Sequence, residues 1–276
     1  MKYNALEWVL LSGCVASYLA ACGVALRRAF ARQEAEGRVW GLLVALGWVA
    51  CAAFLVSAGA RRHACPVVNR MEAMAFVTCL LVLLCAMLDF SFRMRGLTTV
   101  AVPIAALLLA GALALGGSQP ITGETRGHWL YLHISLMLAS YAALAIAFLG
   151  GALFLYQERQ LKTKRFGILF HRLPSLQATD LLTARALLFG FPILTLGILV
   201  GAVWAQTQGV LTTAWYGDPK VILSLFTWLL YLVVIALRLN VKYGGKRVAY
   251  LTVLGFGFLA FTVLGANLVG RGFHRW

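Results

Sequence analysis

Eight long apolar segments follow one another along the chain, and they constrain the fold more than any other feature. They are bounded by charged or turn-forming residues and lie at residues 6–26, 39–60, 73–90, 98–116, 130–156, 181–205, 221–237 and 248–269. A helix needs roughly 20 apolar residues to cross a hydrocarbon layer about 30 Å thick. The sequence therefore predicts an all-α, polytopic integral membrane protein with eight transmembrane helices, and a single transmembrane domain over residues 1–276.

The composition excludes a water-soluble monomer. Hydrophobic residues make up 62% of the chain and charged residues 12%, whereas soluble domains have about 45–50% apolar and about 25% charged residues. The 24 Lys and Arg outnumber the 9 Asp and Glu, but basic residues of polytopic proteins gather in short cytoplasmic loops. We therefore expect the protein to contact membrane lipid and not to bind nucleic acid.

The distribution of basic residues predicts the orientation. The loops 27–38, 91–97, 156–180 and 238–247 hold most of the Lys and Arg. The positive-inside rule places these loops in the cytoplasm. Both termini and the three remaining loops are then extracytoplasmic.

The sequence contains no motif of a catalytic centre. The six cysteines have no C-x-x-C spacing, and five of them lie in apolar segments, where a thiol behaves as a small hydrophobe. We find no Ser-His-Asp order, no carboxylate pair and no metal-thiolate cluster. We therefore expect that the protein is not an enzyme and that any covalent chemistry belongs to a partner.

Two histidines stand on the predicted outer face. His133 lies at the start of the fifth helix and His274 just after the eighth. Histidine is a common axial ligand of haem iron, and two imidazoles on one membrane face are suited to binding a haem from both sides. Aromatic and cationic residues near them are suited to the macrocycle and its propionates, namely Trp204, Trp215, Tyr216, Trp276, Lys220, Arg271 and Arg275. The other interpretation, an interfacial anchor, stays open for each histidine.

Several neighbouring polar residues have simpler interpretations. His128 is expected in the loop before the fifth helix. Met137 and Tyr141 continue the helical face of His133 and are expected to pack. Asp180 and Arg185 flank the start of the sixth helix, where an ionisable pair is satisfied at the interface. The interior glycines are expected to allow close helix packing, and they include Gly190, Gly197 and Gly201.

Three stretches resemble the cytochrome c assembly family of haem-handling membrane proteins, which includes CcsA, CcmC and HemX-like branches. They are "HISLMLASYAAL" from His133, "TDLLTARALLFGFPILTLGILVGAVWA" over residues 179–205, and "GANLVGRGFH" ending at His274. In the family they correspond to the first outer-face histidine, the helix before a tryptophan-rich loop, and the second outer-face histidine. The resemblance is strongest over residues 130–276.

This resemblance implies a function in cytochrome c biogenesis. It implies that haem b binds transiently at the outer membrane face, with His133 and His274 as axial iron ligands, and is then delivered. The residues expected around it are Trp204, Trp215, Asp218, Lys220 and Arg271. The implied partners are other biogenesis subunits and apocytochrome c, and the implied location is the bacterial cytoplasmic (inner) membrane.

The chain also departs from the family pattern. The family's W-x-W-D-P-K-E is "WYGDPKV" here, so Gly217 replaces the second tryptophan and Val221 the acid. CcsA-type members have an intramembrane histidine where this chain has Ala236, and His63 lies one residue out of register. These departures favour the shorter HemX-like branch. They leave an alternative function open, a membrane scaffold or regulator of tetrapyrrole synthesis that has lost haem transfer.

Overall fold

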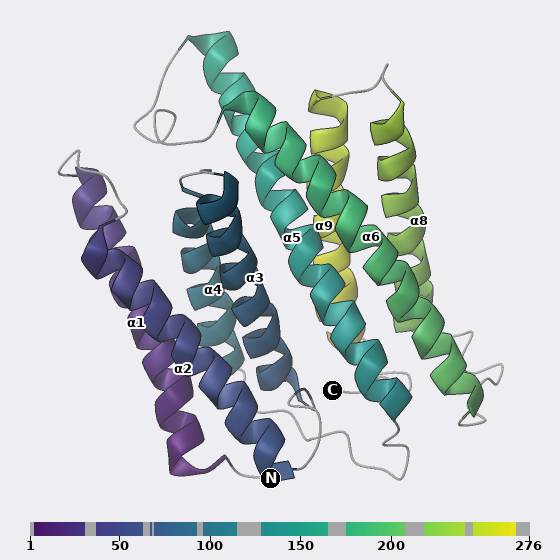
Figure 1. Ribbon diagram of the computed structural model, residues 1–276. Coiled ribbons are helices and arrows are strands. Elements are labelled where there is room, and N and C mark those ends of the chain that lie inside the picture. Colours follow the sequence, from purple (N-terminus) through teal and green to yellow (C-terminus); the bar gives the residue numbers. More distant parts are fainter. Residues whose placement is uncertain are drawn as a thin grey trace. The chain divides into compact units, whose positions relative to one another are not determined.

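The structure is a computed structural model that describes residues 3–30, 37–62, 67, 69–92, 96–114, 128–164, 175–207, 218–240 and 245–268, without the side chains of 29–30, 62, 70, 91–92 and 263–268. These residues form eight helices (Figure 1): α1 (Ala5–Phe30), α2 (Arg38–Arg62), α3 (Arg70–Phe92), α4 (Leu97–Ala114), α5 (His128–Thr163), α6 (Leu176–Thr207), α8 (Pro219–Leu239) and α9 (Lys246–Leu268). The prediction of an all-α fold is confirmed.

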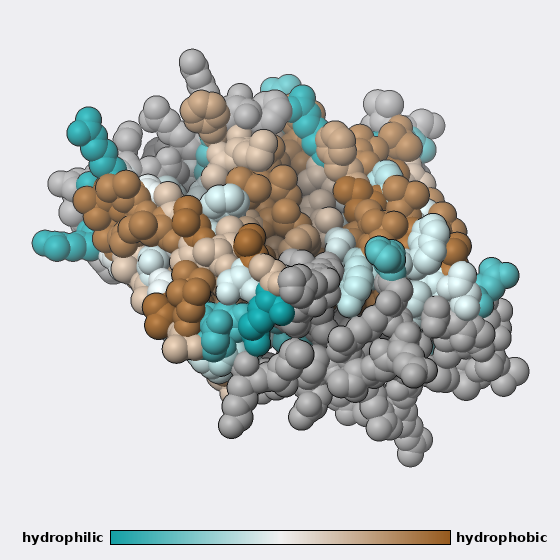
Figure 2. All heavy atoms as spheres, turned by 60° about the horizontal axis from the view of Figure 1, so that its bottom comes forward, coloured by the Kyte–Doolittle hydropathy of each residue, from teal (hydrophilic) through white to brown (hydrophobic). Residues whose placement is uncertain are grey.

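Seven of these helices, α1 to α6 and α8, are long and apolar enough to cross a membrane. The helix α9 occupies the eighth predicted segment, and its assignment as a span stays a prediction. Large apolar side chains point outwards, as in Phe90 (89% exposed), Leu107 (72%) and Phe189 (70%). Figure 2 shows broad apolar areas among the described residues of the face it presents. Such a surface suits lipid, and the chain is an integral membrane protein.

The chain divides into two compact units. Unit 1 contains α1 to α4, in which α1 packs against α2 and α4, and α3 packs against the same two helices. Unit 2 contains α5, α6, α8 and α9, in which α5 packs against α6 and α9, and α8 against α9 and α6. The predicted site residues that the structure describes, His133, Trp204, Asp218 and Lys220, all belong to unit 2.

In unit 1 carboxylate and amide side chains stabilise the ends of the helices. Asn4 and Glu7 form a capping box at the start of α1, with 2.8 Å from the Glu7 N–H to the Asn4 side chain and 2.9 Å for the return bond. Glu7 is fully buried, and Arg61 of α2 binds its carboxylate at 2.8 Å. Asn69 caps α3 by accepting from the N–H of Glu72 at 3.0 Å. These contacts stabilise the helix ends of unit 1, which accounts for the polar groups buried there.

The helix α5 is longer than its apolar segment at both ends. It has 36 residues, or about 54 Å, so it extends beyond a hydrocarbon layer about 30 Å thick. Its last residues are polar but are good helix formers, and Glu158 and Lys162 form an ion pair at 2.6 Å. At the other end His128 is the exposed first residue of α5. The expectation that His128 lies in a loop is wrong, because hydropathy does not mark where a helix begins.

At the opposite end of unit 2 an ion pair joins α6 to α8. Both terminal guanidinium nitrogens of Arg238 donate to the Asp180 carboxylate, at 2.7 Å each. The sequence pattern did not predict this partner, since Arg238 is distant from Asp180 in the chain. We call this the Asp180 end of unit 2.

Candidate functional site at one end of unit 2

Three helix ends lie at the other end of unit 2, which we call the His133 end. Here α5 begins, α6 ends and α8 begins (Figure 1). The antiparallel pairing of α5 with α6 is marked by His133, whose Nδ1 lies 2.7 Å from the Gly197 carbonyl oxygen. The pairing of α6 with α8 is marked by Trp228, whose Nε1 donates to the Thr195 hydroxyl at 2.9 Å. Segments distant in the chain are thus brought to one place.

The last helix also ends on this side. The hydroxyls of Thr227 in α8 and Thr262 in α9 are 3.1 Å apart. Since Thr227 lies in the first half of α8 and Thr262 in the last part of α9, the two helices are antiparallel. The described chain therefore stops, at Leu268, on the His133 side. The residues after it, among them His274 and Arg271, lie outside the described residues.

The imidazole of His133 lies against the backbone of α6. The side chain is half-buried, in the second turn of α5. A Cβ atom built on Gly201 would lie 2.6 Å from Nδ1 and 2.7 Å from Cε1 of His133. No ordinary contact of a Cβ atom is that short, so the ring occupies space that only a glycine leaves open.

The same packing continues along α5 and α6. A Cβ on Gly197 would lie 2.9 Å from the sulfur of Met137, and a Cβ on Gly190 would lie 3.0 Å from Leu144. The expectation that these glycines allow close helix packing is confirmed at Gly190, Gly197 and Gly201. Met137 packs as expected for the face of His133.

Trp204 lies one turn beyond Gly201 on α6. Its indole Nε1 is buried and has no hydrogen-bond partner among the residues that the structure describes. A buried indole N–H usually has an acceptor. Trp204 therefore contributes an indole N–H donor and its own aromatic ring to the His133 end.

Asp218 and Lys220 form the start of α8. Asp218 is the N-cap: its side chain accepts from the Lys220 N–H at 2.8 Å, and Pro219 follows at the first helical position. Asp218 is 3% exposed, and Lys220 is half-buried. The motif "DPK" thus has a local structural reason, since it begins a helix and places a cationic side chain in its first turn.

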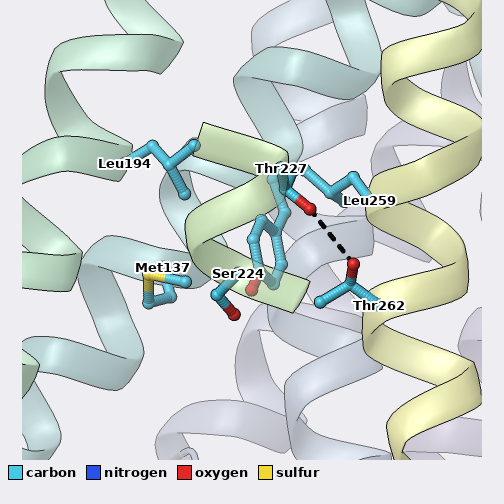
Figure 3. A pocket seen from close by; sticks show the side chains of 7 residues that line it. Met137, Leu194, Ser224, Thr227, Leu259 and Thr262 are labelled. Carbon is cyan, nitrogen blue, oxygen red and sulfur yellow. Dashed lines mark hydrogen bonds between the residues drawn. The ribbon is translucent and has the colours of Figure 1, made fainter. Parts of the chain in front are cut away.

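A small pocket lies between the four helices of unit 2, one turn deeper than His133 on α5. Its empty volume of about 180 Å³ includes space open to solvent, and the enclosed part has room for about one water molecule. Figure 3 shows the hydroxyls of Thr227 and Thr262 joined across it. Its lining residues are Met137, Tyr141, Leu194, Ser224, Thr227, Leu259 and Thr262. This pocket is too small for a tetrapyrrole.

The structure therefore brings four of the predicted site residues to one end of unit 2: His133, Trp204, Asp218 and Lys220. Trp215, and the more weakly matching His63, lie outside the described residues, as His274 and Arg271 do. Within the described ranges no group of three or more His, Cys, Asp or Glu is arranged to hold a metal ion.

Sequence reasoning missed the part played by Gly197 and Gly201. The sequence pattern indicates only that they allow helix packing, and it links them to no particular side chain. The available signal was their spacing of four residues near the end of the sixth segment, in a hairpin whose other helix carries His133 near its start.

The chain is similar to known proteins of one family. The family model described as "Cytochrome C assembly protein" matches residues 67–274. "Cytochrome c biogenesis protein CcsA" of Guillardia theta is 30% identical over 231 residues, covering 76% of each chain. The proteins of that name from Heterosigma akashiwo (29% over 247 residues, 76% of each chain) and Chlamydomonas reinhardtii (34% over 161 residues, 58% of this chain and 43% of that protein) are also similar.

These relatives carry the CcsA name, and the expected closeness to the HemX-like branch is not confirmed. The matched region begins at the start of α3 and includes all of unit 2's helices. From this match over most of its length, the chain belongs to the cytochrome C assembly protein family.

Proposed function

We propose that this protein binds haem at the His133 end of unit 2 and hands it on in cytochrome c biogenesis. The observation that supports this most directly is the imidazole of His133, held 2.7 Å from a backbone carbonyl of α6 at the end of unit 2 where Trp204 and Lys220 also lie. In this proposal His133 and His274 are the axial iron ligands. The haem is haem b and is bound transiently.

The described residues fit such a ligand chemically. An imidazole supplies the nitrogen that haem iron prefers, and Gly201 leaves the space that the ring occupies. The buried indole N–H of Trp204 offers a donor, and Lys220 offers a cation for a propionate. Asp218 contributes indirectly, by beginning α8 and thereby placing Lys220. In the proposal Trp215 and Arg271 complete the aromatic and cationic surroundings.

The proposed mechanism is reversible ligand exchange. Bound haem supplies an iron centre with two axial positions. The protein's imidazoles bind and release at these positions, while aromatic and cationic side chains orient the macrocycle. We propose no covalent step on this chain, and we assign thioether formation to partner subunits acting on apocytochrome c.

The remaining features of the proposal concern placement. We propose that α9 is the eighth span, that residues 1–276 form one transmembrane domain, and that both termini are extracytoplasmic in a bacterial cytoplasmic membrane. The His133 end then lies on the outer face. This orientation is supported by the basic residues of the loops at the opposite ends of the helices.

The experiment is an optical spectrum of the full chain, purified in detergent from haem-replete cells. We expect a Soret band that His133→Ala and His274→Ala each weaken strongly, because each removes one axial ligand. His128→Ala is the matched control, since His128 is an exposed histidine at the start of the same helix. A haem-free wild-type protein, or equal losses in His128→Ala and His133→Ala, would contradict the proposal.

A further inference from the structure

We propose that α6 is the positioning element for His133: the Gly197 carbonyl fixes which imidazole nitrogen carries the proton, and the missing side chain of Gly201 fixes where the ring lies. The consequence for haem rests on the proposed function above. The consequence for the protonation of His133 does not.

The first step concerns the hydrogen bond from His133. A backbone carbonyl oxygen can only accept, so at 2.7 Å the Nδ1 atom of His133 must be the donor. The Gly197 oxygen has two lone pairs, and the helix uses one of them for the N–H four residues later. With the proton on Nδ1, the lone pair of the neutral ring is on Nε2. The helix backbone thereby selects Nε2 as the nitrogen able to bind a metal.

The second step concerns the space at Gly201. A Cβ atom there would meet three atoms of the His133 ring, at 2.6, 2.7 and 3.3 Å. The ring is rigid, so it would have to rotate as a whole, away from the Gly197 oxygen. At Gly197 an added Cβ would first meet Met137 at its sulfur, 2.9 Å away. Since that side chain is flexible, Gly201 is the residue whose substitution acts most directly on the ring.

The first test measures the tautomer in the haem-free wild-type protein. Nitrogen NMR of protein labelled with ¹⁵N-histidine, at about pH 8 where imidazole is neutral, distinguishes protonated from unprotonated ring nitrogens. The His133 signals are identified by their loss in His133→Gln. We expect a protonated Nδ1 and an unprotonated Nε2. A proton on Nε2 would overturn the inference.

The second test compares Gly201→Ala with Gly257→Ala. Gly257 lies within α9, and a Cβ there would meet nothing within 4 Å. We expect Gly201→Ala to change the His133 nitrogen signals and to weaken haem binding roughly tenfold, as is usual when a group that orients a metal ligand is lost. Gly257→Ala should change neither. Unchanged nitrogen signals and unchanged haem affinity in Gly201→Ala would overturn the positioning role.

The two proposals fail in different ways. A wild-type protein that binds no haem but has the proton on Nδ1 would refute the proposed function and leave the positioning of His133 intact. A protein that binds haem through His133 but carries the proton on Nε2 would refute only the inference. If Gly201→Ala does not fold, the wild-type tautomer still decides.

Discussion

The two ends of unit 2 are built from different chemistry. At the Asp180 end charged side chains bind each other: Asp180 of α6 pairs with Arg238 of α8. Glu158 pairs with Lys162 of the same helix at 2.6 Å and approaches Lys246 of α9 at 4.0 Å. The hydroxyl of one buried threonine there also donates to the Gln157 side chain at 3.0 Å. These contacts satisfy the polar groups within the protein itself.

At the His133 end the polar groups are of the kinds that bind ligands. They are the imidazole of His133, the indole N–H of Trp204 and the ammonium of Lys220, while the carboxylate of Asp218 caps a helix. The same four helices are joined by charged contacts at one end and carry binding groups at the other. Substitutions at the Asp180 end should therefore lower stability without affecting haem, whereas those of His133 and Lys220 should affect haem more than stability.

The largest effect on stability is expected from Asp180→Ala. It leaves the Arg238 guanidinium, whose side chain is 17% exposed, without its carboxylate. Loss of one partner of a buried pair costs about 3–5 kcal/mol, and exposed pairs contribute below about 1 kcal/mol. Because the Asp180 side chain is 31% exposed, we expect a loss of about 2 kcal/mol in the free energy of unfolding. Denaturant unfolding in detergent measures it.

The control for this variant is the double substitution Asp180→Leu with Arg238→Leu. It removes both charges and should recover most of the lost stability. The haem content per protein should equal that of the wild type in both variants. Loss of haem without loss of stability in Asp180→Ala would break the comparison between the two ends.

A smaller effect is expected at Asp218, where two variants separate two roles. Asp218→Ala removes the N-cap of α8 and should cost about 1 kcal/mol of stability. Asp218→Asn keeps a capping oxygen and should cost little. If Asp218 acts only by placing Lys220, haem affinity should fall in Asp218→Ala and be retained in Asp218→Asn. Equal loss of haem affinity in both variants would instead assign a direct role to the charge.

The next effect concerns the hydrogen bond between Trp228 and Thr195, midway between the two ends. Trp228→Phe removes the indole N–H and keeps an aromatic ring to stack on Phe191, whose ring centroid is 5.7 Å away. Hydrogen bonds between membrane helices contribute about 0.6 kcal/mol on average. We expect a loss of that size in thermal unfolding, with haem content unchanged. A loss several times larger would show that α6 and α8 depend on this single contact.

The smallest effect is expected for Lys162→Ala. Its ammonium pairs with Glu158 four residues earlier, but the side chain is 65% exposed. Exposed pairs of this spacing contribute very little to stability. High salt should abolish the difference from the wild type in denaturant unfolding, since salt screens exposed charges. A difference that persists in high salt would indicate lost packing rather than lost charge.

Much of the helical architecture could be predicted from the sequence, because a bilayer requires long apolar helices and these are visible as apolar segments. The segment at 221–237 corresponds closely to α8, for instance. The ends of α5 could not be predicted in this way. They depend on helix propensity and on local ion pairs, which hydropathy does not record.

The candidate site was predictable as a set of residue types but not as a geometry. His133 stood out because an imidazole is uncommon beside an apolar segment. Trp204 and Lys220 followed from their aromatic and cationic side chains, and family resemblance added Asp218. The capping role of Asp218 was not anticipated, although "DP" before an apolar segment is a typical helix start. The pairing of Asp180 with Arg238 could not be read from spacing, because it joins residues 58 positions apart.

The amino-acid sequence by itself determined that this chain is helical, lies in a membrane and belongs to its family, because apolar length and local motifs are properties of short stretches of chain. Only the tertiary structure decided that the Gly197 carbonyl and the bare backbone of Gly201 face His133. That contact joins two antiparallel helices. Its existence depends on how closely their backbones approach, and no single segment of the sequence specifies that distance.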